Sequence, residues 1–243
     1  MKYNYKTDTI FPYNVIVGNT IENVWRDTLW CCARNGYNYQ VNKGSYKGQT
    51  RRQLENAMII INEPYTRPLA PRMPEASELP PPTTEEDIEN YFMYYILDGE
   101  KKDNDYLYAD YIKTQLPDVV SYLRYSKGGT NQAVITVGND LSIQTDNPPC
   151  LKIIDFKVVD NRLDMHVYFR SNDLYPAFPC NLGGLQLLKE YLLTLLNYQF
   201  EDGKIYYYSS GLHLYDFCFD LVNQLNVDKI THGQKSNISE ESN

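Results

Sequence analysis

The sequence contains few cysteines, and their spacing argues against two ways of stabilising a protein. Five cysteines occur in 243 residues, at positions 31, 32, 150, 180 and 218, and no two of them form a CxxC pair. Zinc sites and disulfide frameworks need paired or regularly spaced cysteines, so we expect neither a metal nor a disulfide here. The adjacent Cys31 and Cys32 lie in a helix-like segment and are interpreted as free, buried thiols.

Positive charge is also scarce, and long apolar runs are missing. The chain has 23 Lys and Arg residues against 31 Asp and Glu residues, which gives a formal net charge of −8. We therefore expect no polymeric nucleic acid as a partner, although two or three local cations suffice to bind one phosphate. No run reaches the roughly 18 to 20 apolar residues of a membrane span, and the first residues do not lead into a signal-peptide core. These absences predict no membrane contact and a cytoplasmic location.

Length and composition are typical of a globular protein that is rich in tyrosine. We interpret residues 1–230 as a single domain and residues 231–243, which are almost all polar, as a disordered tail. The sequence contains 23 tyrosines. A tyrosine packs its ring while offering a hydroxyl, so we expect many of these residues on half-buried surfaces or lining a pocket.

Four segments have the pattern of helices: 20–36, 84–98, 110–127 and 183–196. The first begins at Asn19 or Thr20 and stops at Gly36, and the second has a capping residue followed by acidic side chains. Pro117 predicts a break in the third. The fourth is apolar on all faces, which predicts a helix that runs through the core.

Strands are expected near the start of the chain and over 54–64, 133–138, 151–159, 163–170 and 204–217, the last including a turn. Residues 160–162 have the composition of a hairpin turn, and the two strands they join are apolar on both faces, which fits a sheet covered on both sides. The proline-rich stretch 65–84 cannot be helix or central strand, so we expect an extended surface connection.

Residues 43–52, KGSYKGQTRR, form a glycine-containing loop with four cations. One interpretation is an ordinary solvated loop. The other is an anion-binding loop whose mobility suits substrate entry.

Polar side chains of different chemistry are concentrated between residues 148 and 215. Cys150 follows two prolines, Arg170 ends a predicted strand, Asp173 follows that strand, and Asn181 and His213 lie beside predicted turns. A thiol, a guanidinium, a carboxylate, an amide and an imidazole at such places suggest an active site.

Three motifs in this stretch resemble the thymidylate synthase family, which includes the pyrimidine nucleotide hydroxymethylases. They are PPC at 148–150, RSNDLYPAFPCNLGGLQLL at 170–188 and HLY at 213–215, in the order and spacing of the family. The resemblance implies an α+β fold with a large mixed β-sheet and helices on one face. It also implies a homodimer in which the other face of the sheet stacks on a partner.

The resemblance further implies a role for each motif residue around a pyrimidine nucleoside monophosphate. Cys150 would be the nucleophile that adds to C6, and Arg170 and Ser171 would bind the phosphate. Asp173 would lie near the base and the folate cofactor, 5,10-methylenetetrahydrofolate. The base edge would be read by Asn181, and the sugar 3′-hydroxyl would be bound by His213 and Tyr215. An asparagine at position 181 favours uracil, since a member that prefers cytosine is expected to carry aspartate there.

The sequence departs from the family pattern in its N-terminal part. The paired arginines that reach the phosphate across the dimer align with Asn131 and Gln132, so Lys47, Arg51 and Arg52 are the expected substitutes. Glu89 is the nearest counterpart of the family's catalytic glutamate, and Tyr95 stands in place of a tryptophan that follows it. Tyr108 is expected to be the active-site tyrosine that orders water for removal of the C5 proton.

Three functions remain open at this point. The first is methylation of dUMP to dTMP, with the folate giving both carbon and hydride. The second is C5 hydroxymethylation of dUMP or dCMP/CMP, in which water takes the place of the hydride. The third is a relative that binds a nucleotide without turnover.

Overall fold

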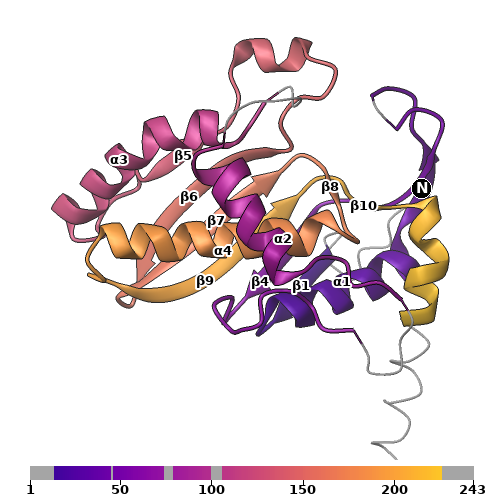
Figure 1. Cartoon of the computed structure of the whole chain (residues 1–243), viewed down its shortest axis with the longest axis horizontal. Helices are drawn as coiled ribbons and strands as arrows, with labels where there is room; N and C mark the ends of the chain where they lie inside the picture. Colours follow the sequence, from indigo (N-terminus) through magenta and orange to yellow (C-terminus); the bar gives the residue numbers. More distant parts are fainter. Residues whose placement is uncertain (1–13, 45, 74–78, 100–105, 226–243) are drawn as a thin grey trace, which may run out of the picture.

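A six-stranded mixed sheet runs through the centre of the structure (Figure 1). The computed structural model describes residues 14–44, 46–73, 79–99 and 106–225. The strands, in their order across the sheet, are β1 (Asn14–Gly18), β4 (Ala57–Ile61), β9 (Glu201–Ser209), β7 (Arg162–Phe169), β6 (Leu151–Val159) and β5 (Val134–Thr136). The pairs β1–β4 and β7–β9 are parallel, and the other neighbouring pairs are antiparallel. The predicted mixed sheet is confirmed.

Buried and exposed side chains alternate along the strands, so this sheet has one buried face and one open face. The buried row that crosses all six strands is Ile16, Ile59, Tyr207, Val167, Ile154 and Ile135, each at most 8% exposed. The adjacent row on the other face is Val17, Ile60, Tyr206, His166, Asp155 and Val134, and all six are half-buried or exposed. The second face, which the sequence predicts to be covered, is therefore open in the single chain.

Helices α1 (Ile21–Asn35), α3 (Ala109–Ser126) and α4 (Ala177–Leu195) lie against the buried row (Figure 1). Helix α1 begins at Thr20, whose hydroxyl accepts from the Asn23 amide, and ends at Gly36, as predicted. Helices on one face of a mixed sheet confirm the predicted α+β class.

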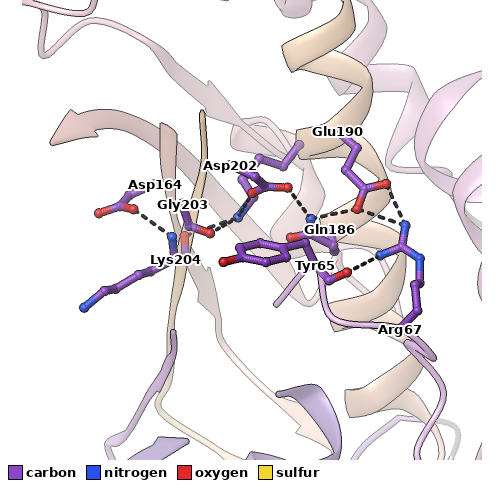
Figure 2. Close-up of polar contacts among 9 residues, drawn as sticks. Tyr65, Arg67, Asp164, Gln186, Glu190, Asp202, Gly203 and Lys204 are labelled. Atoms are coloured by element: carbon purple, nitrogen blue, oxygen red, sulfur yellow. Dashed lines mark hydrogen bonds and ion pairs between the residues drawn. The ribbon is translucent and has the colours of Figure 1, made fainter. Parts of the chain in front are cut away.

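Helix α4 is the predicted core helix, although it begins six residues before Gly183. Its Lys189 is fully buried and pairs with Asp202 at 2.8 Å, while its ammonium also donates to the Gly203 carbonyl oxygen at 2.6 Å. Figure 2 shows how Gln186 and Glu190 continue this polar chain to Arg67 at the surface. The chain of contacts connects α4 to β9 beneath an otherwise apolar interface.

The predicted break of α3 at Pro117 is wrong, because the helix is continuous from Ala109 to Ser126. Proline removes the hydrogen bond to the carbonyl of Lys113. Both residues are exposed, so water can bond that carbonyl, while Ile112 and Leu116 hold the buried side of the helix against the core.

The predicted helix at 84–98 consists of two different helices. Helix α2 (Glu85–Asn90) starts at Thr84, where the Asp87 carboxylate and the Thr84 hydroxyl form a capping box. From Tyr91 to Leu97 the chain continues as a π-helix, η1. The predicted start is confirmed, whereas the π-helical second half was not foreseen.

A second sheet of four strands lies beside the first and is made of β2 (Tyr37–Gln40), β3 (Thr50–Leu54), β10 (Leu212–Tyr215) and β8 (Asn172–Asp173). Two predictions fail here. Residues 50–52 of the predicted basic loop belong to β3, and the predicted strand over 204–217 is β9 and β10, which belong to different sheets. Ser210 and Gly211 are the break between these two strands.

The remaining segments are short. The β6–β7 hairpin turns at Asp160 and Asn161, both with positive φ, as predicted. Two 3-10 helices, η2 (Asp140–Gln144) and η3 (Asp216–Cys218), and a helical stretch over 219–225 complete the described chain. The described part of 65–84 contains no helix or strand, and the predicted tail 231–243 lies outside the described residues. In the part of the chain that is described, no helix has the length and apolarity of a membrane span.

Candidate active site

Cys150 is half-buried at the turn that leads into β6, and Arg170 holds this turn from the end of β7. The backbone N–H of Arg170 donates to the Cys150 carbonyl oxygen at 2.9 Å. Its guanidinium donates to the carbonyl oxygens of Pro149 at 3.2 Å and Pro148 at 2.6 Å. The β6–β7 hairpin therefore brings the thiol and the guanidinium of two sequence motifs to one place.

Four tyrosine rings gather near Cys150. Tyr91 stacks on Tyr95 with ring centroids 5.4 Å apart, and the Tyr95 ring meets that of Tyr108 edge-on at 5.0 Å. The ring of Tyr106 lies 5.6 Å from that of Tyr108. The Tyr108 hydroxyl accepts a hydrogen bond from the N–H of Leu151, the residue after the thiol, at 3.2 Å. The predicted tyrosine thus lies at the site and also holds the backbone there.

Three of these hydroxyls, those of Tyr91, Tyr106 and Tyr108, are neutral at ordinary pH. Burial raises the pKa of Tyr91 and of Tyr108 well above the usual tyrosine value, and the nearby thiols of Cys180 and Cys150 add to the effect at Tyr91. Burial, followed by the neighbouring Cys150, also raises the pKa of Tyr106. Neutral hydroxyls can donate and accept, so this cluster can order water beside the thiol.

His213 on β10 is buried as a neutral imidazole. Its Nδ1 lies 3.0 Å from the Gly211 carbonyl oxygen and 3.4 Å from the Ser171 hydroxyl. A carbonyl only accepts, so Nδ1 carries the hydrogen and Nε2 is left as an acceptor. Burial, the charge of Arg51 and, more weakly, that of Arg170 lower the pKa of His213 to about 4. The buried Nε2 has no partner among the described residues and is available to a ligand hydroxyl.

The Tyr215 ring is surrounded by aromatic and cationic groups. Tyr46 lies 4.4 Å away and Phe217 stacks at 5.5 Å, measured between ring centroids. The guanidinium of Arg51 lies 4.7 Å over the ring and also donates to the Tyr215 hydroxyl. Burial raises the pKa of Tyr215 to about 12, an effect that Arg51 opposes. Arg51, one of the three predicted cations, therefore lies beside the predicted sugar-binding pair.

Asp173 and Asn181 lie on the side of the site formed by β8 and α4. One carboxylate oxygen of Asp173 accepts from the Tyr175 N–H at 3.1 Å, and burial raises its pKa to about 6. Asn181 is buried, and its amide nitrogen donates to the Asn172 side-chain oxygen at 3.1 Å.

Arg170 and Arg51 connect the separate parts of the site electrostatically. Burial lowers the pKa of Lys152, and the charge of Arg170 lowers it further, whereas Cys150 raises it. Both arginines lower the pKa of His213, and Arg51 lowers that of Asp173 against the effect of burial. These two cations therefore act on the thiol, imidazole and carboxylate regions of the candidate site.

Three predicted site residues have surroundings that differ from those of the groups above. Glu89 is exposed on α2, next to the buried Ile88, and Lys47 is exposed in the turn before β3. The Arg52 side chain is bound to Asn38 at 2.9 Å and to the Ala33 carbonyl oxygen at 3.3 Å, on the opposite side of β3 from Arg51.

Sequence reasoning missed Tyr91 and Asn172 as members of the site. A signal for Tyr91 was the pair Gly183–Gly184 in a leucine-rich helix. A Cβ atom at Gly184 would lie 2.5 Å from the Tyr91 ring, so glycine there allows the ring its close approach. Within the described residues, His, Cys, Asp and Glu side chains form no group of three or more that could hold a metal ion.

Comparisons with known proteins point to one protein family. A family model described as thymidylate synthase matches residues 101–241. The chain is 27% identical over 221 residues to a protein of Methanococcoides burtonii named "Putative thymidylate synthase", covering 87% of this chain and 94% of that protein. A protein of the same name from Methanosarcina acetivorans is 28% identical over 185 residues, covering 74% and 81%. The chain is also 34% identical over 106 residues to the "Deoxyuridylate hydroxymethyltransferase" of Bacillus phage SP01, covering 42% of this chain and 27% of that protein.

Proposed function

Because this chain belongs to the thymidylate synthase family, we propose that it transfers a one-carbon unit from 5,10-methylenetetrahydrofolate to C5 of a uracil nucleotide, converting dUMP to dTMP. The observation that carries the proposal is the setting of Cys150. The thiol is half-buried, its turn is held by the Arg170 guanidinium, and neutral tyrosine hydroxyls lie beside it.

The chemistry begins with addition of the Cys150 thiolate to C6 of the pyrimidine. C5 of uracil is a poor nucleophile until C6 is saturated, and a soft thiolate adds there reversibly. The electron pair of the C5–C6 double bond then lies on C5, which forms the bond to the incoming carbon. Water ordered by Tyr108, as we assign it, would accept the C5 proton while the bond between the transferred carbon and the folate nitrogen breaks. Hydride in methylation, or water in hydroxymethylation, would then bind the transferred carbon as Cys150 leaves C6, which restores the planar ring.

The polar groups away from the thiol suit the rest of the nucleotide. We assign the phosphate to Arg170, Ser171 and Arg51, since a guanidinium fork and a hydroxyl match phosphate oxygens. Lys47 is exposed and remains a proposed phosphate ligand, whereas the contacts of Arg52 already use its guanidinium elsewhere. His213 Nε2, as a buried acceptor without a partner among the described residues, would accept from the sugar 3′-hydroxyl beside Tyr215.

The residues present fit a reduced pterin as the carbon donor. Tyr95 and Tyr106, with centroids 6.2 Å apart, offer aromatic surface, and Asp173 offers a half-buried carboxyl group with a pKa of about 6. Bound 5,10-methylenetetrahydrofolate would supply the one-carbon unit and, for methylation, the hydride. Asp173 would hydrogen-bond the pterin, and the tyrosine rings would exclude bulk water from C5.

Hydroxymethylation of C5 is the second candidate function. A phage relative carries that activity in its name, and Tyr95 stands where the family has a tryptophan. The cluster around Cys150 contains four hydroxyl groups, from Tyr91, Tyr95, Tyr106 and Tyr108. Tyrosine hydroxyl groups bind water more readily than an indole ring does, and water is the nucleophile of this alternative reaction.

Tritium release from C5 tests the proposal. We expect the protein to release tritium from [5-³H]dUMP when 5,10-methylenetetrahydrofolate is present, and we expect Cys150→Ala to abolish the release. Cys31→Ala, which removes a half-buried free thiol from α1, is the matched control and retains activity. The mass of the product distinguishes a methyl from a hydroxymethyl group. Only methylation forms dihydrofolate, so only methylation produces the increase in absorbance that dihydrofolate causes. No release from dUMP or dCMP would overturn both reactions and favour a nucleotide-binding relative.

Glu89 remains the proposed carboxylate for proton handling and departure of the folate group. Glu89 and Glu86 are both exposed on α2, so Glu86→Gln is a matched control for Glu89→Gln. We expect Glu89→Gln to lower turnover with little change in nucleotide binding. Equal turnover of the two variants would remove Glu89 from the mechanism.

A further inference from the structure

Three buried polar side chains form a hydrogen-bonded chain beneath the site. The Asn181 amide nitrogen donates to the Asn172 side-chain oxygen at 3.1 Å, and the Asn172 amide nitrogen donates to the Tyr207 hydroxyl at 3.1 Å. The three residues are at most 8% exposed and come from α4, β8 and β9. Nothing in the nucleotide chemistry described above uses Asn172 or Tyr207.

Tyr207 forms the fixed end of this hydrogen-bonded chain, because its ring is packed between other aromatic rings. Its ring stacks on Phe169 at 5.2 Å and meets Phe178 edge-on at 5.0 Å, measured between centroids. Burial raises the pKa of Tyr207 far above its ordinary value, so the hydroxyl stays neutral. Ser209 is a further hydrogen-bond partner of that hydroxyl, and its own oxygen accepts from the Gly211 N–H at 3.3 Å. The Tyr207 oxygen accepts from the Asn172 amide nitrogen.

The order of donors and acceptors along the chain leaves one orientation for the Asn181 amide. Because the Asn172 nitrogen donates to Tyr207, its oxygen points toward Asn181 and can only accept. A reversed Asn181 would place two carbonyl oxygens against each other and leave two buried acceptors unpaired, which is costly. The Asn181 side chain therefore keeps its oxygen and its second N–H free for a ligand.

We propose that Asn172 is a positioning residue that fixes the amide of Asn181, with Tyr207 as its anchor, and so sets the preference for uracil over cytosine. The inference rests on the proposed function, in which Asn181 meets the base edge. Uracil presents an N3–H donor and an O4 acceptor, which match a fixed Asn181 oxygen and N–H. Cytosine presents the reverse, an N3 acceptor and a 4-amino donor, and a match would require the amide to flip and lose its bond to Asn172.

Binding of dUMP and dCMP, measured by calorimetry on the full chain without folate, tests this role. The quantity of interest is the ratio of the dCMP to the dUMP dissociation constant. In Asn172→Leu the Asn181 amide can rotate, and we expect the ratio to fall about tenfold, the scale of one hydrogen bond. Asn172→Asp retains an oxygen that accepts from Asn181, so its ratio stays within about twofold of the wild-type value.

A loss of folding stability would weaken the binding of both nucleotides alike and leave the ratio of their dissociation constants unchanged. Thr28→Val, which removes a buried hydroxyl from α1 where it bonds to the Val24 carbonyl oxygen, is the matched control. If Asn172→Leu does not fold, Tyr207→Phe removes the anchor and lowers the ratio in the same direction.

The outcomes separate the positioning role from the proposed function. A lowered ratio in Asn172→Leu with a retained ratio in Asn172→Asp supports the role. An unchanged ratio in a folded Asn172→Leu that still binds dUMP overturns the role and leaves the proposed function intact. Failure of the wild-type protein to bind either nucleotide overturns the proposed function, and with it this inference.

Discussion

Arg51 donates a hydrogen bond to the hydroxyl of Tyr215 and also lies over its ring. The contact joins β3 to β10, whose pairing places Arg51 opposite Tyr215 in register. Arg52, the next residue, points to the other side of the strand, where it bonds to Asn38 and lies over the Phe219 ring at 4.6 Å. Two adjacent arginines of one predicted basic loop therefore have different surroundings.

Replacing Arg51 should weaken nucleotide binding, and replacing Arg52 should not. We expect Arg51→Gln to raise the dissociation constant of dUMP by about tenfold or more, because a hydrogen bond to a charged group contributes ~1.5–3 kcal/mol. Arg52→Gln removes the same charge from the neighbouring position and should change the constant by less than about threefold. Calorimetric titration of both variants with dUMP measures the difference. Equal effects would mean that the two cations act only through their net charge.

The pH dependence of stability should contain two opposing contributions from the site. The folded-state pKa of His213, about 4, is below its usual value of 6.5, so its contribution is complete above about pH 6.5 and is lost as pH falls toward 4. The folded-state pKa of Asp173, about 6, is above its usual value of 3.8, so its contribution is complete below about pH 3.8 and is lost as pH rises through 6. Each shift corresponds to roughly 3 kcal/mol, and between pH 4 and 6 the two slopes oppose each other.

Single variants should uncover these slopes. In His213→Gln the Asp173 contribution is no longer opposed. We therefore expect the melting temperature of this variant to fall relative to wild type as pH rises from 4 to 6. Asp173→Asn should do the reverse and make the melting temperature rise more steeply over the same range. Thermal unfolding followed by circular dichroism at pH 4, 5, 6 and 7 measures both. Parallel curves for the wild type and the two variants would contradict the assigned pKa shifts.

The polar chain of Figure 2 contains a buried and an exposed ion pair, which should contribute very differently to stability. The Lys189 side chain is 0% exposed and that of Asp202 is 19% exposed, whereas Arg67 and Glu190 are 46% and 32% exposed. Asp202→Ala leaves a buried ammonium unpaired and should lower the free energy of unfolding by about 3 kcal/mol or more. Arg67→Ala should cost about 0–1 kcal/mol. Urea denaturation of both variants measures the two losses in the free energy of unfolding. Equal losses would contradict the expected difference between the buried and the exposed ion pair.

Features specified by nearby residues were predictable from the sequence. The Thr20 cap and Gly36 bound α1, and Asp160 with Asn161 turns the β6–β7 hairpin. The motif residues could be named because the family resemblance depends on sequence order, and the structure joins two of the motifs where Arg170 bonds to the turn at Pro148, Pro149 and Cys150.

Features that depend on distant contacts could not be predicted. The split of 204–217 into two strands depends on which sheet each half joins, and the apolar pattern is the same in both. The turn from α-helix to π-helix at Tyr91 occurs where the ring packs against Gly184, 93 positions away in the sequence. The bond between Asn172 and Tyr207 likewise joins residues 35 positions apart.

The open face of the six-stranded sheet should be the interface of a homodimer, which we propose on the basis of the family resemblance. Val15 and Val17 are 51% and 55% exposed, and Ile153 and Tyr168 on the same face are 40% and 36% exposed. Clustered apolar side chains of this kind are uncommon on the surface of a monomer.

We expect Val17→Asp to convert a dimer into a monomer in sedimentation equilibrium, because a carboxylate cannot be buried unpaired at the interface. Tyr125→Asp, which changes an 84% exposed side chain on α3, is the control and should leave the dimer intact. A wild-type protein that sediments as a monomer, or a Val17→Asp variant that remains a dimer, would show that this face is not the interface.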